Sequence, residues 1–192
     1  MKPKDEIIRS SVKSLITVAE GLLADDVSAS IEAAGRAMIV CLKRGGKILA
    51  FGNGGSAADA DHFVAELVGR YKKERKGLAA VSLVSNTATI TAVSNDYSYG
   101  DSFKRQVEAL GADGDIAFGI STSGNSPNVI GAVKAAKSLG LTVVALTGCG
   151  GGSLAGQSDI SIIVPSADTP RVQEAHILII HGLCDIIDRT VV

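Results

Sequence analysis

The sequence of 192 residues lacks tryptophan, and aromatic residues make up only 4% of it. Proteins that bind single-stranded nucleic acid stack bases on aromatic side chains, and this composition offers no such platform. An excess of charge of one sign is also missing, because 19 Lys and Arg are balanced by 20 Asp and Glu, for a formal net charge of −1. A large non-specific nucleic-acid footprint needs a basic surface. We therefore expect no nucleic acid among the partners.

Cysteine is scarce, and long apolar runs are absent. Cys41, Cys149 and Cys184 are widely spaced and form no CxxC pair, which is typical of reduced thiols in a cytoplasmic protein. No apolar run approaches the roughly 20 residues that span a bilayer, and the polar segment 1–6 gives no sign of a signal peptide. We expect a cytoplasmic protein without membrane contact, with Cys41 and Cys184 in the core and Cys149 on an exposed loop without a role.

The remaining composition is that of a globular protein, 46% hydrophobic and 20% charged, and long enough for one domain with a sizeable core. Apolar runs alternate with helical patterns. The runs are continuous rather than alternating, which is typical of a parallel sheet covered on both faces. The sequence therefore predicts an α/β fold with a doubly wound, five-stranded parallel sheet flanked by helices. We expect its strands at 47–52, 79–84, 115–120, 142–147 and 160–164.

Two predicted helices, at 6–24 and about 28–43, precede the first strand. Two helices before the first strand are more than are needed to cover the sheet. Their apolar faces could pack on each other or on a second subunit. We assign segment 1–45 to oligomerisation within a single domain of residues 1–192. The basic run 70–76 is interpreted as a solvated connection. Further helices are expected at 56–70, 87–94, 99–110, 127–139 and 169–190.

Two short loops of small residues each follow a predicted strand and lead into a predicted helix. They are Gly52-Asn53-Gly54-Gly55-Ser56 and Ser121-Thr122-Ser123-Gly124-Asn125-Ser126. Helix N-termini leave backbone N–H groups unpaired, so anions bind there readily. The second loop adds four hydroxyls and no Lys or Arg, which suits a phosphorylated metabolite that must bind and leave. The alternative is two ordinary strand–helix turns that happen to be rich in Gly and Ser.

The position of these loops in a doubly wound sheet indicates where a ligand binds. Ligands of such sheets bind outside the carboxyl ends of the strands, at a topological switch point. Both loops lie at such ends, and so does Ser94-Asn95-Asp96, so three loops can converge on one pocket. Ser126 followed by Pro127 predicts a helix start with an N-cap hydroxyl and proline at the first helical position.

Few ionisable side chains could join this pocket. His62 and Glu66 are four residues apart and share a helix face. Gln173 and His181 are eight apart, roughly 80° around a helix. Together the two pairs could close a metal site, for which His and carboxylate suit zinc and an amide is a weaker ligand. The alternatives are a plain surface pair at His62 and Glu66 and a divalent ion other than zinc; we interpret His176 as structural.

Five segments in combination resemble the phosphoheptose isomerases of the sugar-isomerase (SIS) family. The resemblance covers nearly the whole chain, including the two N-terminal helices, and shows no departure from the family pattern at these positions. It implies a homotetramer with active sites at subunit interfaces and one zinc ion per subunit. The segments are the loop 52–56, His62-Phe63-Val64-Ala65-Glu66-Leu67-Val68-Gly69-Arg70-Tyr71, Asn95-Asp96, the loop 121–126 and Arg171-Val172-Gln173-Glu174-Ala175-His176.

The resemblance also implies which residues act. The implied zinc ligands are His62, Glu66, Gln173 and His181. The implied phosphate ligands are Ser121, Thr122, Ser123 and Ser126. The implied contacts with the sugar are Asn53, Gly54, Gly55, Asn95 and Asp96, and we expect Ser56, Glu66 and Gln173 to reach the ligand as well.

The implied reaction is the aldose–ketose isomerisation of sedoheptulose 7-phosphate to D-glycero-D-manno-heptose 7-phosphate, a precursor of bacterial surface heptose. Moving a proton between C1 and C2 through an enediol needs a base on carbon, an acid–base group near the oxygens and stabilisation of oxyanion charge. Our hypothesis makes Glu66 the base and His181 the acid–base partner. Zinc would polarise or organise the C1 and C2 oxygens.

Two non-enzymatic members of the family are the alternatives. One is a factor that associates with the replication initiator DnaA; the family pattern implies that it lacks the residues matching Glu66 and His181 and carries a bulky basic residue in place of Ser123. The other is a sugar-phosphate-sensing regulator, which would normally be joined to a DNA-binding segment. No helix-turn-helix in a basic context precedes residue 47.

Overall fold

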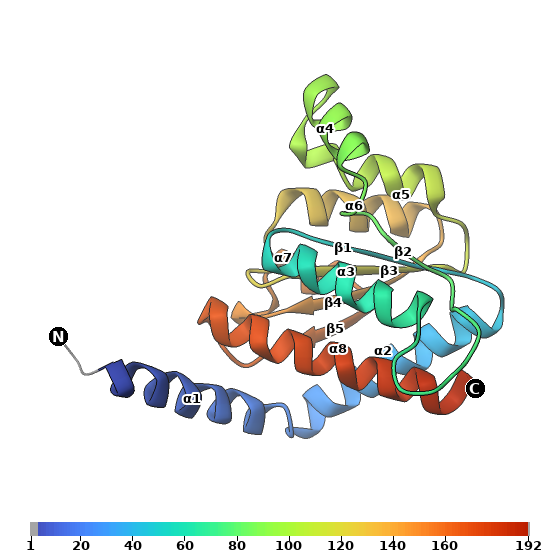
Figure 1. The fold of residues 1–192 in the computed structure, drawn as a ribbon. Helices are drawn as coiled ribbons and strands as arrows, with labels where there is room; N and C mark the ends of the chain where they lie inside the picture. Colours follow the sequence, from blue (N-terminus) through green and yellow to red (C-terminus); the bar gives the residue numbers. More distant parts are fainter. Residues whose placement is uncertain (1–3, 192) are drawn as a thin grey trace.

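Five parallel strands in the order β2-β1-β3-β4-β5 form the central sheet of the computed structural model, which describes residues 4–191 (Figure 1). In this flavodoxin-like order the direction of winding reverses between β1 and β3. The expected doubly wound, five-stranded parallel sheet is therefore confirmed, although β2 is shorter than the predicted 79–84. The strands are β1 (Ile48–Gly52), β2 (Ala80–Ser82), β3 (Ile116–Ser121), β4 (Thr142–Thr147) and β5 (Ile160–Ile163).

Helices cover both faces of the sheet, as continuous apolar strands require. The predicted helix over 99–110 is split into a 3-10 turn, η1, and a short helix, α5. The Gly-rich segment after β4 contains a second turn, η2, and a four-residue helix, α7. The full set is α1 (Lys4–Gly21), α2 (Asp25–Lys43), α3 (Gly55–Val68), α4 (Thr87–Asp96), η1 (Tyr99–Asp101), α5 (Lys104–Leu110), α6 (Pro127–Ser138), η2 (Cys149–Gly151), α7 (Gly152–Ala155) and α8 (Thr169–Val191).

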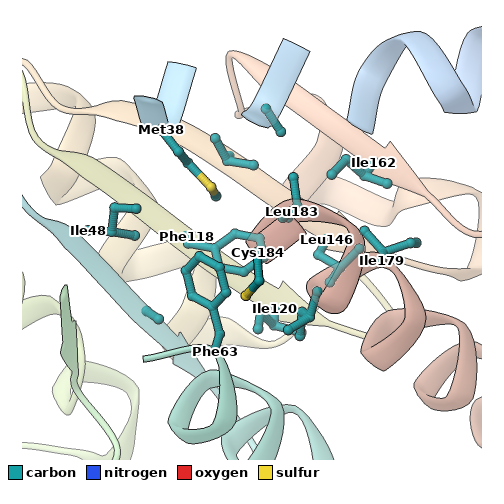
Figure 2. Close-up of a cluster of buried hydrophobic side chains, with 14 of the residues drawn as sticks. Met38, Ile48, Phe63, Phe118, Ile120, Leu146, Ile162, Ile179, Leu183 and Cys184 are labelled. Atoms are coloured by element: carbon teal, nitrogen blue, oxygen red, sulfur yellow. The ribbon is translucent and has the colours of Figure 1, made fainter. Parts of the chain in front are cut away.

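Two hydrophobic clusters lie on opposite faces of the sheet. Successive strand residues point to opposite faces, so Ile48 packs with α2, α3 and α8 while Leu49 packs with α5, α6 and α7. The first cluster includes the edge-to-face pair Phe63 and Phe118, whose ring centroids are 5.1 Å apart (Figure 2). The buried Cys184 lies in the same cluster. These contacts fix α3 and α8 side by side on one face of the sheet.

The cysteines lie where the sequence predicts, with Cys41 and Cys184 buried and Cys149 exposed. Within residues 4–191, no helix combines the length and the apolar character needed to cross a membrane. Of the expected polar start at 1–6, residues 1–3 lie outside the described residues, as does residue 192 of the predicted domain.

The N-terminal helices do not serve only to cover the sheet. Both α1 and α2 pack against α8. In Figure 1, α1 extends away from the sheet at the N-terminal end of the chain. One of its faces leaves large apolar side chains exposed, namely Ile7, Ile8, Val12 and Ile16, and Leu23 follows between α1 and α2.

The basic run 70–76 is not simply a solvated connection, so that interpretation was wrong in part. Tyr71 is half-buried and packs against the first hydrophobic cluster. The side chain of Arg75 is only 4% exposed and pairs with Asp188 of α8. The remaining positions of the run, including Lys72 and Lys73, are exposed.

His176 of α8 is fully buried, consistent with the structural role predicted for it. Neither ring nitrogen has a hydrogen-bond partner among residues 4–191. Burial lowers the pKa of the His176 imidazole to about 4, and the nearby backbone of Thr147 opposes this effect only in part. His176 is therefore neutral in the folded protein at physiological pH.

This burial predicts an acid-sensitive stability. A histidine in the unfolded chain has a pKa near 6.5, so between about pH 6.5 and pH 4 the unfolded state binds a proton that the folded state does not, and stability falls as the pH falls. We expect His176→Leu to remove an acid-dependent loss of up to about 3 kcal/mol. Urea unfolding of both proteins at pH 7 and pH 4.5 measures it, and identical pH dependence in the two proteins would contradict it.

Candidate active site

Gly52 and Gly54 let the first loop turn sharply from β1 into α3. A Cβ on Gly52 would lie 2.7 Å from the Ser56 carbonyl oxygen and 2.8 Å from that of Ile120. Gly54 has a φ of 56°, which side chains rarely adopt. The N-terminus of α3 consequently lies close to the end of β3, with Ser56 buried between them.

The second loop carries its hydroxyls at the start of α6. Pro127 is at the first helical position, as predicted, but within the described chain Ser126 makes no capping hydrogen bond, so that part of the prediction was wrong. The Ser126 Oγ instead lies 2.9 Å from the Ser121 Oγ. In the first turn of α6 the Val129 amide donates to Asn128 Oδ1 at 3.0 Å. A helix N-terminus binds an anion through the amides that have no such partner.

The Gly-rich segment after β4 supports this loop, a role that the sequence analysis did not foresee. The Gly148 amide donates to the Thr122 carbonyl at 3.1 Å, and the Leu154 amide to the Gly124 carbonyl at 2.9 Å. A Cβ on Gly124 would collide with the Gly151 carbonyl. The cluster of glycines was the available signal, since such close approach of two backbones excludes side chains.

A pair of amide side chains joins the two loops. The Asn53 amide donates to Asn128 Oδ1 at 2.8 Å, and the Asn128 amide donates back to Asn53 Oδ1 at 2.9 Å. Asn128 is buried in the first turn of α6, and the Tyr99 hydroxyl also donates to Asn53 Oδ1 at 2.8 Å. The sequence analysis missed Asn128 and Tyr99; the only signal was a polar residue directly after Pro127.

The third predicted loop reaches the site through Tyr99 rather than through Asn95 and Asp96. The Asn95 amide donates to the Asp96 carboxylate at 2.9 Å, and both side chains are exposed at the end of α4. In Figure 1, α4 stands at the outer end of the molecule, away from α3 and α8. Across residues 4–191, no hydrogen bond joins Asn95 or Asp96 to either small-residue loop.

Three of the four predicted metal ligands converge between α3 and α8. The Nε2 atoms of His62 and His181 are 3.0 Å apart, and Glu66 Oε1 lies 3.4 Å from His62 Nε2. Tyr71 stacks on the His181 imidazole, with ring centroids 5.8 Å apart and an interplanar angle of 26°. His62 thus lies close to one imidazole and one carboxylate, which are donor types that zinc prefers.

Gln173 is placed elsewhere along the contact between α3 and α8. Its amide fills the space that a Cβ on Gly55 would need, at the start of α3. Because Gln173 and His181 are eight residues apart on α8, Gln173 lies about 12 Å along the helix axis from His181. Within residues 4–191, no three His, Cys, Asp or Glu side chains form a ready metal site. Gln173 is thus positioned at the first loop rather than at the two histidines.

Asp59 is a carboxyl group of this face that the sequence analysis did not single out. It lies on α3 between Gly55 and His62, and its buried Oδ2 has no hydrogen-bond partner in the described part of the chain. Burial raises the pKa of Asp59 to about 6, partly offset by the nearby His62. This face of α3 therefore presents, besides Glu66, a second carboxyl group, and the pKa of that group lies close to neutral pH.

The site has two chemically different ends. At one end, hydroxyls at the start of a helix offer neutral donors suited to a phosphate. At the other end, His62, Glu66 and His181 offer groups that can move protons. A polar ligand bearing a phosphate matches this arrangement better than an apolar ligand or a polyanion.

Comparison with known proteins agrees with this chemistry. A family model described as SIS domain matches residues 14–148. A phosphoheptose isomerase of Aliarcobacter butzleri is 50% identical over 96% of this chain and 97% of its own length. One from Campylobacter jejuni is 57% identical over 82% of this chain and 85% of its own length.

A solved structure shares the fold along almost the whole chain. The phosphoheptose isomerase of Neisseria gonorrhoeae superposes with a TM-score of 0.92 at 44% identity, covering 97% of this chain and 100% of the other. Since the family model spans most of the sequence and relatives at least half identical cover nearly all of it, the chain belongs to the SIS family, among the phosphoheptose isomerases.

Proposed function

We propose that this protein converts sedoheptulose 7-phosphate to D-glycero-D-manno-heptose 7-phosphate through an enediol, the first step of bacterial heptose precursor synthesis. Relatives named phosphoheptose isomerase that match nearly the whole chain support this assignment. The observation that carries it is the close approach of His62 to both Glu66 and His181 on two parallel helices of a fold whose second loop carries hydroxyls.

The isomerisation moves one proton between neighbouring carbons. In our proposal Glu66 takes the proton from one carbon and returns it to the other, while His181 exchanges a proton with the C1 and C2 oxygens. Both groups project from helices packed on the core, so their spacing is held before substrate arrives. A half-buried pair of this kind serves no evident purpose in a protein that only binds, and nothing in the described residues favours the initiator-associating alternative.

The loops hold the rest of the substrate. Ser121, Thr122, Ser123 and Ser126 bind the phosphate at the start of α6 and so position the far end of the sugar. Asn53, Gly54, Gly55, Ser56 and Gln173 face the sugar from the first loop and α8. Asn95 and Asp96 are proposed to contact it as well, which requires α4 to approach the loops in the complex.

A zinc ion fits the convergent donors. Two imidazole nitrogens 3.0 Å apart with a carboxylate oxygen nearby are spaced much as neighbouring ligands of one small ion would be. We propose His62, Glu66 and His181 as ligands, with Gln173 completing the set after movement of its amide or from a second copy. When bound, zinc supplies a Lewis acid for the sugar oxygens.

The exposed apolar face of α1 fits assembly. Ile8 and Ile16 are 66% and 51% exposed, although such side chains are rarely left in water together on one face. We propose that further copies cover this face in a homotetramer whose active sites lie at subunit interfaces. The reduced cysteines fit a cytoplasmic location, where phosphorylated sugars are metabolised.

Loss of either proton-transfer group is expected to abolish turnover without unfolding the protein. Glu66→Gln and His181→Gln should each lower kcat for sedoheptulose 7-phosphate by about 100-fold or more, with unchanged circular dichroism. Glu32→Gln on the exposed face of α2 is the control and should retain wild-type turnover. Near-normal activity in Glu66→Gln would rule out Glu66 as the base.

Metal analysis tests the cofactor independently of activity. We expect about one zinc per chain in the purified protein, and His62→Ala should lower that content because it removes one of the convergent donors. Elemental analysis of both proteins after identical dialysis measures this. Equal metal content in wild type and variant would contradict the proposed ligands while leaving the reaction open to separate assay.

Assembly is tested by placing charge on α1. Ile8→Asp and Ile16→Asp together should lower the solution mass from that of a tetramer, because a carboxylate cannot be buried in an apolar contact without a partner. Light scattering measures the mass, and Lys13→Asp on the same helix is the control. A monomeric wild type would overturn the proposed assembly.

A further inference from the structure

The segment between α3 and β2 is attached to α8 by a buried ion pair. Arg75 and Asp188 have side chains only 4% and 2% exposed, and Arg75 Nε donates to Asp188 Oδ1 at 2.7 Å. The second oxygen of Asp188 accepts the backbone amides of Lys72 and Lys73 at 3.0 and 3.2 Å. In Figure 1 this segment passes alongside the C-terminal part of α8. The Asp188 carboxylate thus binds three residues of this connection.

The same guanidinium reaches the last turn of α3. Arg75 donates from one terminal nitrogen to the Glu66 carbonyl at 2.9 Å and from the other to the Leu67 carbonyl at 2.8 Å. The last four carbonyls of a helix lack intrahelical donors, and a cation at this end also favours the helix dipole. Arg75 therefore caps the turn that carries Glu66.

The segment also touches the partner of Glu66. Tyr71 lies four residues before Arg75 and stacks on the His181 imidazole. Both groups of the proposed acid–base pair are consequently contacted from one connection, Glu66 through its backbone and His181 through its ring.

We propose that Arg75, held by Asp188, is a positioning residue that sets the distance between Glu66 and His181. This inference rests on the proposed function of those two residues. A contribution to stability does not by itself explain why Arg75 and Asp188 form a buried ion pair, because replacing such a pair by apolar residues is often neutral or stabilising. The fork of the guanidinium instead joins α8 to the two carbonyls of one particular turn of α3, a geometry that a single ammonium does not reproduce.

A second ion pair with a buried carboxylate, Lys47 and Asp115, provides a control. Asp115 is also buried, accepts the backbone amides of Lys47 and Ala112 at 2.9 Å each, and pairs with the Lys47 ammonium. It directly precedes β3, and within residues 4–191 its carboxylate bonds only to Lys47 and Ala112, with no hydrogen bond to α3, α8 or the segment 69–79. Asp188→Asn and Asp115→Asn therefore make the same chemical change at two buried carboxylates, of which only Asp188 is bonded to the segment that contacts Glu66 and His181.

The test compares Arg75→Lys, Asp188→Asn and Asp115→Asn with the wild type at a temperature where all are folded. We expect all three variants to melt at lower temperature, and only Arg75→Lys and Asp188→Asn to lower kcat, by about tenfold, with KM within about twofold. Equal kcat in Asp188→Asn and Asp115→Asn would overturn the inference.

A second measurement separates this inference from the proposed function. The chain has three histidines, so selectively labelled protein gives three imidazole NMR signals. We expect Arg75→Lys and Asp188→Asn to shift the signals of His62 and His181 but not of His176, and Asp115→Asn to shift none of them. If the wild type does not isomerise the sugar but these shifts occur, the function is wrong and the positioning stands. If the signals do not move, the positioning is wrong even in an active enzyme.

Discussion

The parallel packing of α3 against α8 is the contact on which the candidate site depends. Phe63 of α3 and Leu183 of α8 both enter the cluster beneath the two helices, so the helices cannot separate without opening the core. His62 and His181 face each other because this contact sets the register of one helix against the other, and Gln173 faces Gly55 for the same reason. The spacing of the polar groups is thus a consequence of apolar packing.

The ligand end of the site depends on backbone rather than on charge. Gly52 lets α3 start against the end of β3, and Gly124 lets the second loop pass the Gly-rich segment at close range. The reciprocal amide pair of Asn53 and Asn128 then ties the two loops into one unit. Because the two amides bond to each other, the buried Asn128 is not left without a partner. Such a cradle is rigid before any ligand arrives, and its donors are neutral.

Much of this could be predicted from local patterns. Continuous apolar runs predicted the five parallel strands, and Gly52–Ser56 and Ser121–Ser126 predicted the loops at their carboxyl ends. The predictions failed where the partner of a side chain could not be read from its neighbours in sequence. Ser126 was expected to cap α6, but its hydroxyl meets Ser121. Arg75 was assigned to solvent, because nothing near it in sequence indicates that Asp188 lies beside it.

By itself the sequence determined the fold class, the two small-residue loops at the carboxyl ends of the strands and the residue types available there, because periodicity and glycine placement act over a few neighbours. Tertiary structure decided which of those residues meet. Gln173 and His181 share one helix but lie about two turns apart, whereas His62 and His181 are 119 positions apart in sequence and 3.0 Å apart in space. Only the packing of helices on a common sheet sets such distances, since a turn or helical period relates residues only within its own element.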